Sequence, residues 1–244
     1  MRLALIGDPV AHSRSPRLHR RFLEEAGIDG DYVSIRVPRD NAVDVLRRMR
    51  MDGYTGCNVT YPLKEEALRA CDVIDEEARR VGAVNTVLFG MEIRGTNTDG
   101  IGARSALESV LDEPLALKRV GVLGTGATAR AILSALQACD AYAFAWGRDD
   151  EKVADLHARF ECDAWPEDNP PEITINTLPP DVVLPASLVD QLQLTDFVMD
   201  ANYGERATLA KQLRREVIPG DAMLEAQARA SFDYWLAHVE RVGN

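Results

Sequence analysis

A lysine at the start of a predicted helix is the residue in this sequence best suited to proton transfer. The segment 58–64 (Asn-Val-Thr-Tyr-Pro-Leu-Lys) ends a strand, and Pro62 is expected to open a helix with Lys64 in its first turn. The positive end of a helix dipole disfavours a charged ammonium, so an amine at that position gives up its proton more easily. A lysine that exchanges a proton with a substrate needs this property. The alternative is a surface lysine paired with Glu65 or Glu66.

Asp99 is the carboxylate that we expect to act with Lys64. It lies in the segment 95–100 (Gly-Thr-Asn-Thr-Asp-Gly), which opens another predicted helix. Asp99 either caps that helix or stands beside Lys64, where an acidic partner would orient the amine. The segment 82–86 adds the amide of Asn85 and a hydroxyl at a strand start. Such groups donate and accept hydrogen bonds, which suits a polyhydroxylated ligand.

Two serines begin an earlier helix. The segment 12–16 (His-Ser-Arg-Ser-Pro) predicts Ser15 as the N-cap and Pro16 as the first helical residue. Residues 11–21 contain four arginines and no acidic residue. The hydroxyls of Ser13 and Ser15 at this positive helix end therefore form a candidate site for a carboxylate or phosphate, with a simple helix cap as the alternative.

A Gly-x-Gly turn follows a predicted strand in the second half of the chain. The strand covers 120–123, the turn 124–126 and the helix 127–137. Gly124 permits the tight turn, and Gly126 lets the backbone approach a pyrophosphate that the helix N-terminus stabilises. The alternative is a turn without a ligand. The candidate cofactor residues here are Gly124, Thr125, Gly126 and Ala127.

The residues after the next strand bear on the choice of cofactor. Arg148, Asp149 and Lys152 stand where the dinucleotide fingerprint places the residue that meets the adenosine ribose. Arg148 and Lys152 would bind a 2′-phosphate and favour NADP, whereas Asp149 would accept a 2′-hydroxyl and favour NAD. We expect NADP, with NAD not excluded and a solvated turn as the alternative to both.

Strand-like and helix-like segments alternate along the chain, a pattern that predicts an α/β fold with mostly parallel sheets. The pattern divides into two series with a boundary near residues 97–102. A cleft between two domains is a usual ligand site. The expected strands are 3–6, 32–37, 54–59, a pair over 83–94, 120–123, 141–146, 173–176 and 197–200, and the expected helices are 16–26, 39–50, one from about 62, 127–137, 151–160 and 221–240.

Composition excludes several classes of protein. The chain has 244 residues, of which 46% are apolar, and a net charge of −11, which argues against a nucleic-acid-binding surface. No apolar run approaches the ~20 residues needed to cross a membrane, and the N-terminus lacks the features of a signal peptide. The four cysteines form no Cys-x-x-Cys pair, which argues against a zinc or other metal site and predicts reduced thiols in the cytoplasm.

Together these segments resemble the shikimate dehydrogenase family. The matching motifs follow the family's order: Ser-x-Ser-Pro at 13–16, Asn-Val-Thr-x-Pro-x-Lys at 58–64, Gly-Ala-Val-Asn-Thr at 82–86, Asn-Thr-Asp-Gly at 97–100, Gly-x-Gly at 124–126, and Met-Leu-x-x-Gln-Ala at 223–228. The resemblance implies NADP-dependent, reversible reduction of 3-dehydroshikimate to shikimate, on the way to chorismate and the aromatic amino acids. It also implies a monomer or homodimer.

The resemblance further implies a substrate-binding domain over 1–98, completed by the C-terminal helix 221–244, and a Rossmann-like NADP-binding domain over 99–220. Lys64 would pass a proton to or from the C3 oxygen, and Asp99 would position it. The implied substrate ligands are Ser13 and Ser15 for the carboxylate, Tyr203 near it, and Thr60, Asn85, Asp99 and Gln227 for the hydroxyls. The implied cofactor residues are 124–127, Arg148, Asn176 and Thr177.

Three positions depart from the family's pattern. Ala127 replaces a common second glycine, Asp149 a common threonine and Glu205 a frequent proline. A relative that acts on quinate or an amino-shikimate therefore stays open, as does NAD. A different class of protein would be a non-catalytic dinucleotide-binding regulator on the same fold. A methylene-tetrahydrofolate-type dehydrogenase would leave the Ser-x-Ser motif and Gln227 without a role.

Overall fold

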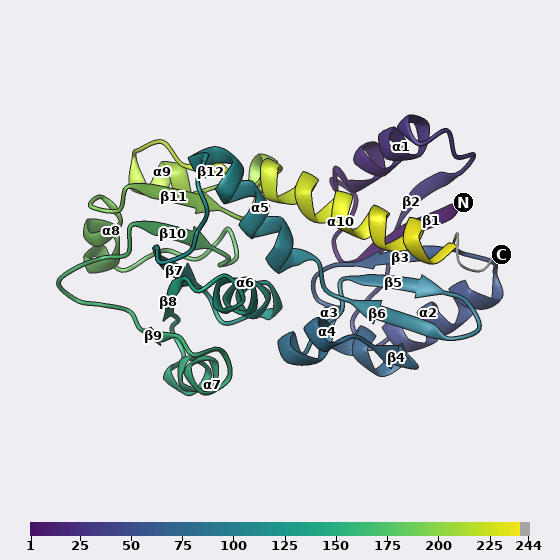
Figure 1. The fold of residues 1–244 in the computed structure, drawn as a ribbon, viewed down its shortest axis with the longest axis horizontal. Coiled ribbons are helices and arrows are strands. Elements are labelled where there is room, and N and C mark those ends of the chain that lie inside the picture. Colours follow the sequence, from purple (N-terminus) through teal and green to yellow (C-terminus); the bar gives the residue numbers. More distant parts are fainter. Residues whose placement is uncertain (240–244) are drawn as a thin grey trace. The chain divides into compact units, whose positions relative to one another are not determined.

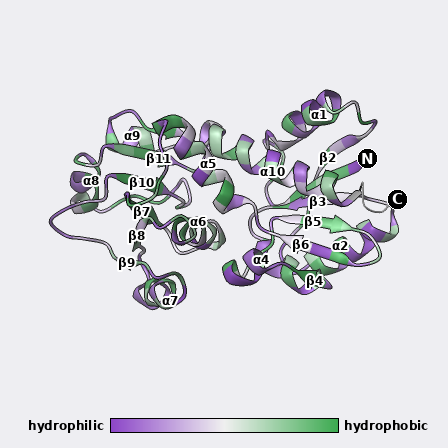
Figure 2. Cartoon of the chain, in the orientation of Figure 1, coloured by the Kyte–Doolittle hydropathy of each residue, from purple (hydrophilic) through white to green (hydrophobic). Residues whose placement is uncertain are grey.

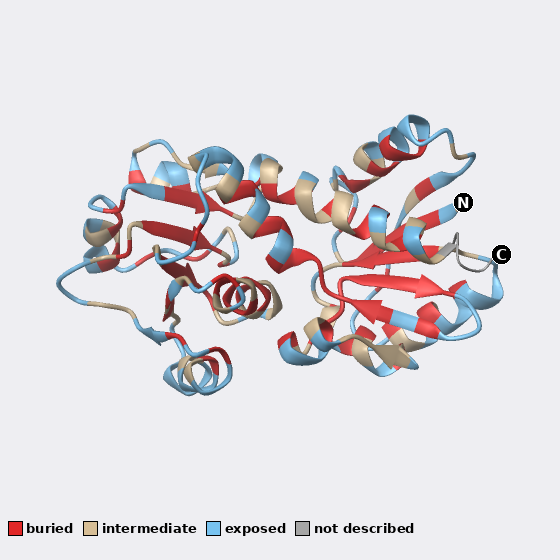
Figure 3. Ribbon diagram, viewed as in Figure 1, coloured by how far each residue is buried: buried red, intermediate tan, exposed pale blue. Residues whose placement is uncertain are grey.

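The computed structural model describes residues 1–239 and divides into two compact units (Figure 1). The first unit is Met1–Thr98 together with the chain from Gln227 onward, and the second is Asp99–Ala226. In the described part, each unit contains a six-stranded sheet flanked by helices. The strands of both sheets are mostly buried, whereas helices such as α1, α2 and α7 also carry exposed residues on one side (Figure 3).

The first unit has the strand order β2-β1-β3-β5-β6-β4. Its strands are β1 (Arg2–Gly7), β2 (Asp31–Arg36), β3 (Gly56–Val59), β4 (Val73–Ile74), β5 (Thr86–Phe89) and β6 (Ile93–Thr96). Its helices are α1 (Ser15–Glu25), α2 (Ala42–Met51), α3 (Lys64–Ala67), a 3₁₀ turn Leu68–Ala70, α4 (Glu76–Val81), and α10 (Asp221–Val239) from Gln227 onward.

The sheet of the first unit is mostly parallel, as predicted, and β5 is the exception. β1 pairs in parallel with β2 and β3, whereas β5 runs antiparallel to both β3 and β6. The first residue of β5, Thr86, is paired with Asn58 near the end of β3 and with Thr96 at the end of β6. The start of β5 therefore lies at the same edge of the sheet as the ends of its two neighbours.

Both faces of this sheet are covered by helices. Successive side chains of a strand point to opposite faces, so a run of apolar residues buries both. In β1, Ala4 and Ile6 pack in the cluster with α2 and α3, whereas Leu3 and Leu5 pack on the opposite face with α1 and α10. A run of consecutive apolar residues in a short strand thus indicates a strand buried between two helical layers.

The C-terminal helix α10 lies directly on the sheet of the first unit. The indole of Trp235 is fully buried and donates a hydrogen bond to the carbonyl of Val87 at 2.9 Å. A Cβ on Gly56 would lie 2.5 Å from Trp235 Nε1, so the glycine makes room for this helix. The helix predicted over 221–240 is observed as far as Val239, and residue 240 lies outside the described residues.

The second unit has the order β12-β11-β10-β7-β8-β9, and all its strand pairs are parallel. If β7 to β12 are numbered 1 to 6 and the sheet is read from its β9 edge, the order is 3-2-1-4-5-6, that of the Rossmann fold. The strands are β7 (Arg119–Leu123), β8 (Tyr142–Trp146), β9 (Asp163–Ala164), β10 (Ile173–Asn176), β11 (Phe197–Asp200) and β12 (Ile218–Pro219). The helices are α5 (Asp99–Leu111), α6 (Ala127–Gln137), α7 (Asp150–Phe160), α8 (Ala186–Leu192), a 3₁₀ turn Gly204–Arg206, and α9 (Leu209–Leu213).

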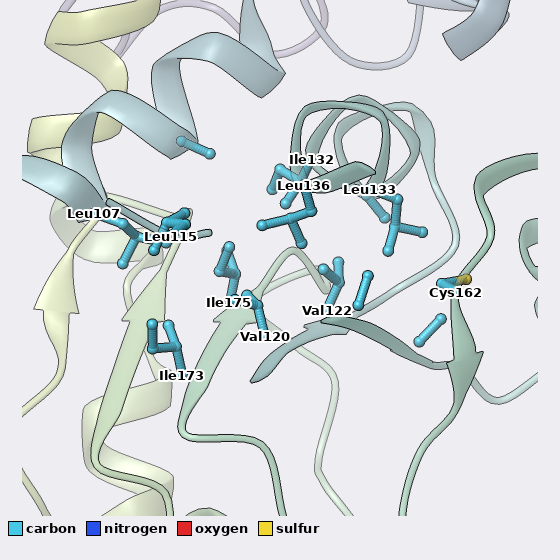
Figure 4. Packing of buried hydrophobic residues seen from close by; sticks show 14 of the residues in the cluster. Leu107, Leu115, Val120, Val122, Ile132, Leu133, Leu136, Cys162, Ile173 and Ile175 are labelled. Carbon is cyan, nitrogen blue, oxygen red and sulfur yellow. The ribbon is translucent and has the colours of Figure 1, made fainter. Parts of the chain in front are cut away.

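The core of the second unit forms between α6 and the sheet. Ile132 and Leu136 of α6 point toward Val122 of β7 and Ile175 of β10 (Figure 4). The exposed helix α7 alternates hydrophobic and hydrophilic residues around its axis (Figure 2), and only its Leu156 and Phe160 are buried. Short elements such as β9 and α9 were not predicted, because a segment of two to five residues is too short to show a periodic pattern.

Two predicted helix starts need correction. Ser15 is not the N-cap of α1, because Arg14 occupies that position and Ser15 is the first helical residue. The helix expected from about residue 62 begins at Lys64 and is a single turn of four residues. Pro62 lies in the turn before it rather than inside it. The dipole of so short a helix is small, and this weakens the helix-dipole argument for Lys64.

Two kinds of feature are missing from residues 1–239. No helix there is both long and apolar enough to cross a bilayer. No group of three or more His, Cys, Asp or Glu side chains there is arranged to hold a metal ion.

His19 is a buried histidine between α1 and α10. Its ring stacks on Tyr32 with centroids 4.3 Å apart and also contacts Phe22 and Trp235. Neither ring nitrogen has a hydrogen-bond partner among the described residues. Burial lowers the pKa of His19 to about 3; the nearby Asn58 side chain opposes this shift, and the Arg229 guanidinium adds to it.

We expect His19→Phe to remove part of the pH dependence of stability. The folded pKa of about 3 lies below the ordinary value of 6.5, so the unfolded chain binds a proton first and stability falls as the pH drops below 6.5. Between pH 7 and pH 5 this group alone lowers the free energy of unfolding by about 2 kcal/mol. Urea denaturation at pH 7 and pH 5 measures the loss, and equal losses in both proteins would contradict the assignment.

Candidate functional site

The predicted substrate residues of the first unit follow strand ends at one edge of its sheet. The chain adds β2 on one side of β1 and β3 on the other, so the strand order reverses between β1 and β3. Ligands of open α/β sheets bind outside the carboxyl ends of strands at such a point. Ser13 and Ser15 follow β1, Thr60 and Lys64 follow β3, and Asn85 precedes the antiparallel β5.

The loops after β1 and β3 lie against each other. The backbone N–H of Asp8 donates to the carbonyl of Tyr61 at 3.0 Å. A Cβ on Gly7 would lie 2.3 Å from the Thr60 methyl group, so only glycine fits at the end of β1. This close approach brings the loop with Ser13 and the loop with Thr60 to the same edge.

Ser13 and Ser15 form a small hydroxyl pair. Their Oγ atoms are 3.2 Å apart, and the backbone N–H of Ser15 donates to Ser13 Oγ at the same distance. The Ser13 hydroxyl therefore satisfies the N–H of the first helical residue, although the N-cap itself is Arg14, whose side chain makes no capping bond. Two of the nearby arginines are paired with acids from outside 11–21, Arg20 with Asp31 and Arg21 with Glu25. The positive charge at this helix is thus partly neutralised.

Lys64 stands next to the segment that carries Asn85. Its carbonyl accepts the backbone N–H of Val84 at 2.8 Å. The alternative of a Lys64–Glu66 pair finds no support, because the buried Glu66 carboxylate accepts the backbone N–H groups of Asp40 and Ala42 at the start of α2. Glu66 thus stabilises α2.

Asn85 is buried and its amide is held in one orientation by Thr98 and Thr86. Asn85 Oδ1 accepts the Thr98 N–H at 2.9 Å and the Thr86 hydroxyl at 2.8 Å, and Nδ2 donates to Thr98 Oγ1 at 3.0 Å. The Thr98 hydroxyl also donates to the carbonyl of Gln227 at 3.1 Å. Thr98 thereby brings two predicted substrate ligands, Asn85 and Gln227, into one cluster.

Asp99 is the first residue of α5 and belongs to the second unit. It is buried, and its Oδ2 accepts a hydrogen bond from the Thr128 hydroxyl at 3.2 Å. Thr128 lies in the first turn of α6, the helix that follows the Gly-x-Gly turn. The second unit therefore links the predicted catalytic carboxylate to the predicted cofactor helix.

The Gly-x-Gly turn lies where the strand order of the second unit reverses, between β7 and β10. Gly124 has φ +118°, a conformation that favours glycine, and a Cβ there would lie 2.4 Å from Thr177 Oγ1. The Thr177 hydroxyl donates to the carbonyl of Leu123 at 2.8 Å. Thr177 therefore packs against Gly124 and is bonded to Leu123, the last residue before the turn.

Gly126 differs from Gly124 because nothing in the fold requires a glycine there. It is the N-cap of α6 with φ −79°, and a Cβ would meet no described atom within 4 Å. No side chain caps α6 and its first turn contains no acidic residue. No described side chain therefore blocks the N–H groups at the start of this eleven-residue helix next to Gly126. An anion site at a helix N-terminus requires such accessible N–H groups.

The residues after β8 are exposed and contain one internal ion pair. Asp149 is the N-cap of α7 and accepts the backbone N–H of Lys152 at 3.2 Å, and the Lys152 ammonium lies 3.1 Å from its other oxygen. These hydrogen bonds to Lys152 lower the pKa of the Asp149 carboxyl below its ordinary value. Arg148 is exposed beside them.

Asn176 is placed differently from the other predicted cofactor residues. It is buried, donates to Asp200 Oδ1 at 3.0 Å and accepts the backbone N–H of Leu178 at 3.2 Å. Asp200 in turn accepts hydrogen bonds from Asn202. This cluster shapes the loops after β10 and β11, and the half-buried Tyr203 follows it.

A surface depression of about 270 Å³ in the second unit contains none of the predicted cofactor residues. It is lined by residues such as Leu117, Asp140 and Tyr142. Tyr142 begins β8, whereas Arg148 follows the end of that strand. The depression therefore lies at the opposite edge of the sheet from the Gly-x-Gly turn.

Comparison with known proteins identifies the family. Residues 5–87 match the family model described as the shikimate dehydrogenase substrate binding domain. The shikimate dehydrogenase (NADP(+)) of Bacillus licheniformis is 34% identical, and the alignment covers 96% of this chain and 91% of that protein. The chain belongs to the shikimate dehydrogenase family. The enzyme of the same name from Acidiphilium cryptum is 44% identical, but the alignment covers only about half of that protein, 56%, and 64% of this chain.

Solved structures of shikimate dehydrogenases share this fold. The Thermus thermophilus enzyme, solved in complex with NADP(H) and shikimate, superposes with a TM-score of 0.85 at 31% identity and covers 96% of this chain and 93% of that one. The 5-ketofructose reductase of a Gluconobacter strain superposes with a TM-score of 0.80 at 26% identity, covering 97% of this chain and 93% of that one. Both the family and the two-domain α/β fold predicted from the motifs are thus confirmed.

The structure adds polar residues that the sequence analysis did not select. Asn58 and Thr98 lie inside the quoted motifs, so their positions already carried a signal. Ser231 lies in an otherwise ordinary stretch of α10 and Thr128 in a helix rich in alanine, and no pattern distinguished either. Their importance follows only from the hydrogen bonds that the fold creates.

We expect alanine at the two turn glycines to have different effects on stability. Gly124→Ala combines a positive φ with a contact to Thr177 and should lower the melting temperature of the protein by several degrees. Gly126→Ala has neither problem and should leave it within about 1 °C of the wild type. Thermal denaturation followed by circular dichroism measures both, and a stable Gly124→Ala variant would contradict the observed turn geometry.

Proposed function

We propose that this protein is an NADP-dependent shikimate dehydrogenase that interconverts 3-dehydroshikimate and shikimate on the way to chorismate and the aromatic amino acids. Its family membership supports this, as does the similarity to a structure that holds NADP(H) and shikimate. The observation that carries the proposal is the collection of Ser13, Thr60, Lys64 and Asn85 at one sheet edge of the first unit.

In this proposal most of the substrate-binding residues lie in the first unit, and Asp99 and Tyr203 come from the second. The hydroxyls of Ser13 and Ser15 hold the carboxylate with Tyr203 near it, and Thr60, Asn85, Asp99 and Gln227 hold the ring hydroxyls. The amide of Asn85 suits this role, because its orientation is already fixed by Thr98. A preoriented amide binds a hydroxyl without a further ordering cost.

The second unit binds the dinucleotide in this proposal. The open approach at Gly126 and the uncapped start of α6 fit a pyrophosphate. The exposed cations Arg148 and Lys152 fit a 2′-phosphate. Thr125, Ala127 and Thr177 line the same turn, whereas Asn176 acts through the loop that it shapes. When bound, the reduced cofactor NADPH would supply the hydride for ketone reduction, and NADP(+) would accept it in the reverse direction, which no side chain can do.

Lys64 transfers the proton in the proposed mechanism. Reduction of the C3 ketone creates negative charge on its oxygen, and the Lys64 ammonium stabilises that charge and donates a proton to it. In the oxidation of shikimate the Lys64 amine takes the proton back. The Asp99 carboxylate accepts a hydrogen bond from the reacting hydroxyl and orients the lysine. A buried carboxylate held by Thr128 is suited to this task.

We expect Lys64→Ala to lower kcat for shikimate oxidation by about 10²–10⁴-fold, because positioned proton transfer contributes that much. The KM for shikimate should change far less, since other residues hold the substrate. Steady-state kinetics that follow the absorbance of the reduced cofactor measure both constants. Lys118→Ala is a matched control, because Lys118 pairs with Glu113 at the amino end of β7. An unchanged kcat in Lys64→Ala would remove this lysine from the mechanism.

The same assay tests the function itself. Shikimate and quinate are each offered with NADP and with NAD, and we expect the highest kcat/KM for shikimate with NADP. A preference for quinate would identify a relative with altered substrate. Dinucleotide binding without turnover of either acid would identify a regulator on the same fold.

Asp149 should weaken the preference for NADP, because it ties up Lys152 and adds a negative charge beside Arg148. Asparagine is an equally good N-cap, so Asp149→Asn keeps α7 capped while it removes the charge. We expect the ratio of kcat/KM for NADP over NAD to rise several-fold in this variant. Kinetics with both cofactors measure the ratio, and binding of adenosine 2′,5′-bisphosphate measured by calorimetry should tighten in parallel. A ratio that falls or stays constant would contradict this role.

We also propose that the protein works in the cytoplasm. All four of its cysteines are free, and three of them are buried, which suits a reducing compartment. Its partners in this proposal are small molecules rather than nucleic acid or a membrane. A monomer or a homodimer stays the prediction for its assembly, and light scattering after gel filtration measures it.

A further inference from the structure

Ser231 is a buried serine in α10 that connects three other segments of the first unit. Its Oγ lies 2.7 Å from Thr86 Oγ1 and 3.0 Å from Thr98 Oγ1. It accepts a hydrogen bond from Asn58 Nδ2 at 3.0 Å, and its hydroxyl is 3.0 Å from the carbonyl of Gln227 one turn earlier. Ser231 has no exposed surface, so these groups rather than solvent satisfy its hydroxyl.

Two of these partners are the residues that hold Asn85. The Thr86 hydroxyl donates to Asn85 Oδ1 at 2.8 Å, and Thr98 Oγ1 accepts from Asn85 Nδ2 at 3.0 Å. The backbone N–H of Thr98 can only donate, so the Asn85 oxygen must face it. The amide therefore has one orientation, and Ser231 contacts both hydroxyls that support it.

Asn58 fixes the direction of the hydrogen bonds at the other end of the cluster. The Asn85 backbone carbonyl can only accept, so the amide nitrogen Nδ2 of Asn58 must face it at 3.1 Å, and the same nitrogen donates to Ser231. Asn58 Oδ1 then accepts the Tyr32 hydroxyl at 2.8 Å. Thr86 and Thr98 are buried with Ser231. In such an interior a group that loses its partner is not compensated by water, and the arrangement resists change.

We propose that Ser231 is a positioning residue for substrate binding. It holds the hydroxyls of Thr86 and Thr98 so that the amide of Asn85 meets the cyclic hydroxy-acid in a fixed orientation. This inference rests on the proposed function, in which Asn85 binds a substrate hydroxyl. Ser231 is fully buried and therefore acts through Asn85 rather than on the substrate itself.

The first test is Ser231→Ala in the full-length protein. The KM for shikimate and its dissociation constant from calorimetry should rise about tenfold, as the loss of one hydrogen bond predicts. The KM for NADP should stay constant, because the residues proposed to bind NADP belong to the second unit. The matched control is Ser134→Ala, which removes a buried serine from α6 and should leave the KM for shikimate unchanged.

A double-mutant cycle distinguishes positioning from a general structural effect. In an Asn85→Ala background the additional change Ser231→Ala should no longer weaken shikimate binding, because the amide that it orients is absent. An unchanged dissociation constant in folded Ser231→Ala, or a full tenfold loss in the Asn85→Ala background, would overturn the proposal.

Thr86→Val provides a second variant if Ser231→Ala does not fold. It removes the hydroxyl between Ser231 and Asn85 at nearly constant shape and should give the same selective rise in the KM for shikimate; an unchanged KM in this variant would equally overturn the proposal. Failure of the proposed function would look different, because the wild-type protein would then neither bind nor oxidise shikimate.

Discussion

The reversal of strand order beside the first strand of each sheet determines where this chain can bind ligands. Two neighbouring strands whose connections leave in opposite directions keep their carboxyl ends uncovered. In the first unit this happens between β1 and β3, and in the second between β7 and β10. The loop with Ser13 and the turn before Lys64 follow the two strands at the first point, and the Gly-x-Gly turn and Thr177 follow the two strands at the second. The rest of each sheet holds these segments in place.

The antiparallel strand β5 adds a further constraint in the first unit. Because it runs against β3 and β6, the residues before it join the residues that follow its neighbours. This places Asn85, which comes just before β5, beside Thr98 and within reach of α10. If β5 were parallel to its neighbours, its last residues and not Asn85 would lie at this edge. The polar groups collected at this edge are buried and must satisfy one another, which explains the dense hydrogen bonding among Asn58, Asn85 and Ser231.

Much of the fold could be predicted from the sequence, because its long elements have clear periodicity. The helix 127–137 was predicted with its observed bounds, as was the strand 173–176. The start of α1 was misplaced by one residue, because serine is a preferred N-cap whereas the backbone makes Arg14 the N-cap and Ser15 the first helical residue. The helix expected from about residue 62 starts at Lys64 and is a single turn, because Pro62 indicates that a helix is near but not where it starts or how long it is.

The candidate site could be predicted from the sequence only where the type of a residue indicates its chemical role. Lys64, Asp99 and the turn glycines stand out in the sequence, but the difference between Gly124 and Gly126 does not. Gly124 must be glycine because of its positive φ and its close contact with Thr177, whereas no backbone angle or contact requires glycine at position 126. Glu66 shows the same limit, since it lies next but one to Lys64 in the sequence and caps a different helix.

The two units illustrate two ways to prepare a protein surface for a polar ligand. In the first unit the amide of Asn85 is fully oriented by buried neighbours, which suits a neutral hydroxyl, because discrimination between hydroxyl positions depends on direction. In the second unit the N–H groups of α6 lie uncapped behind Gly126. An anion is attracted by charge and dipole over a wider range of directions. A rigid polar cluster and an open helix end are therefore the arrangements that hydroxyl and phosphate recognition respectively require.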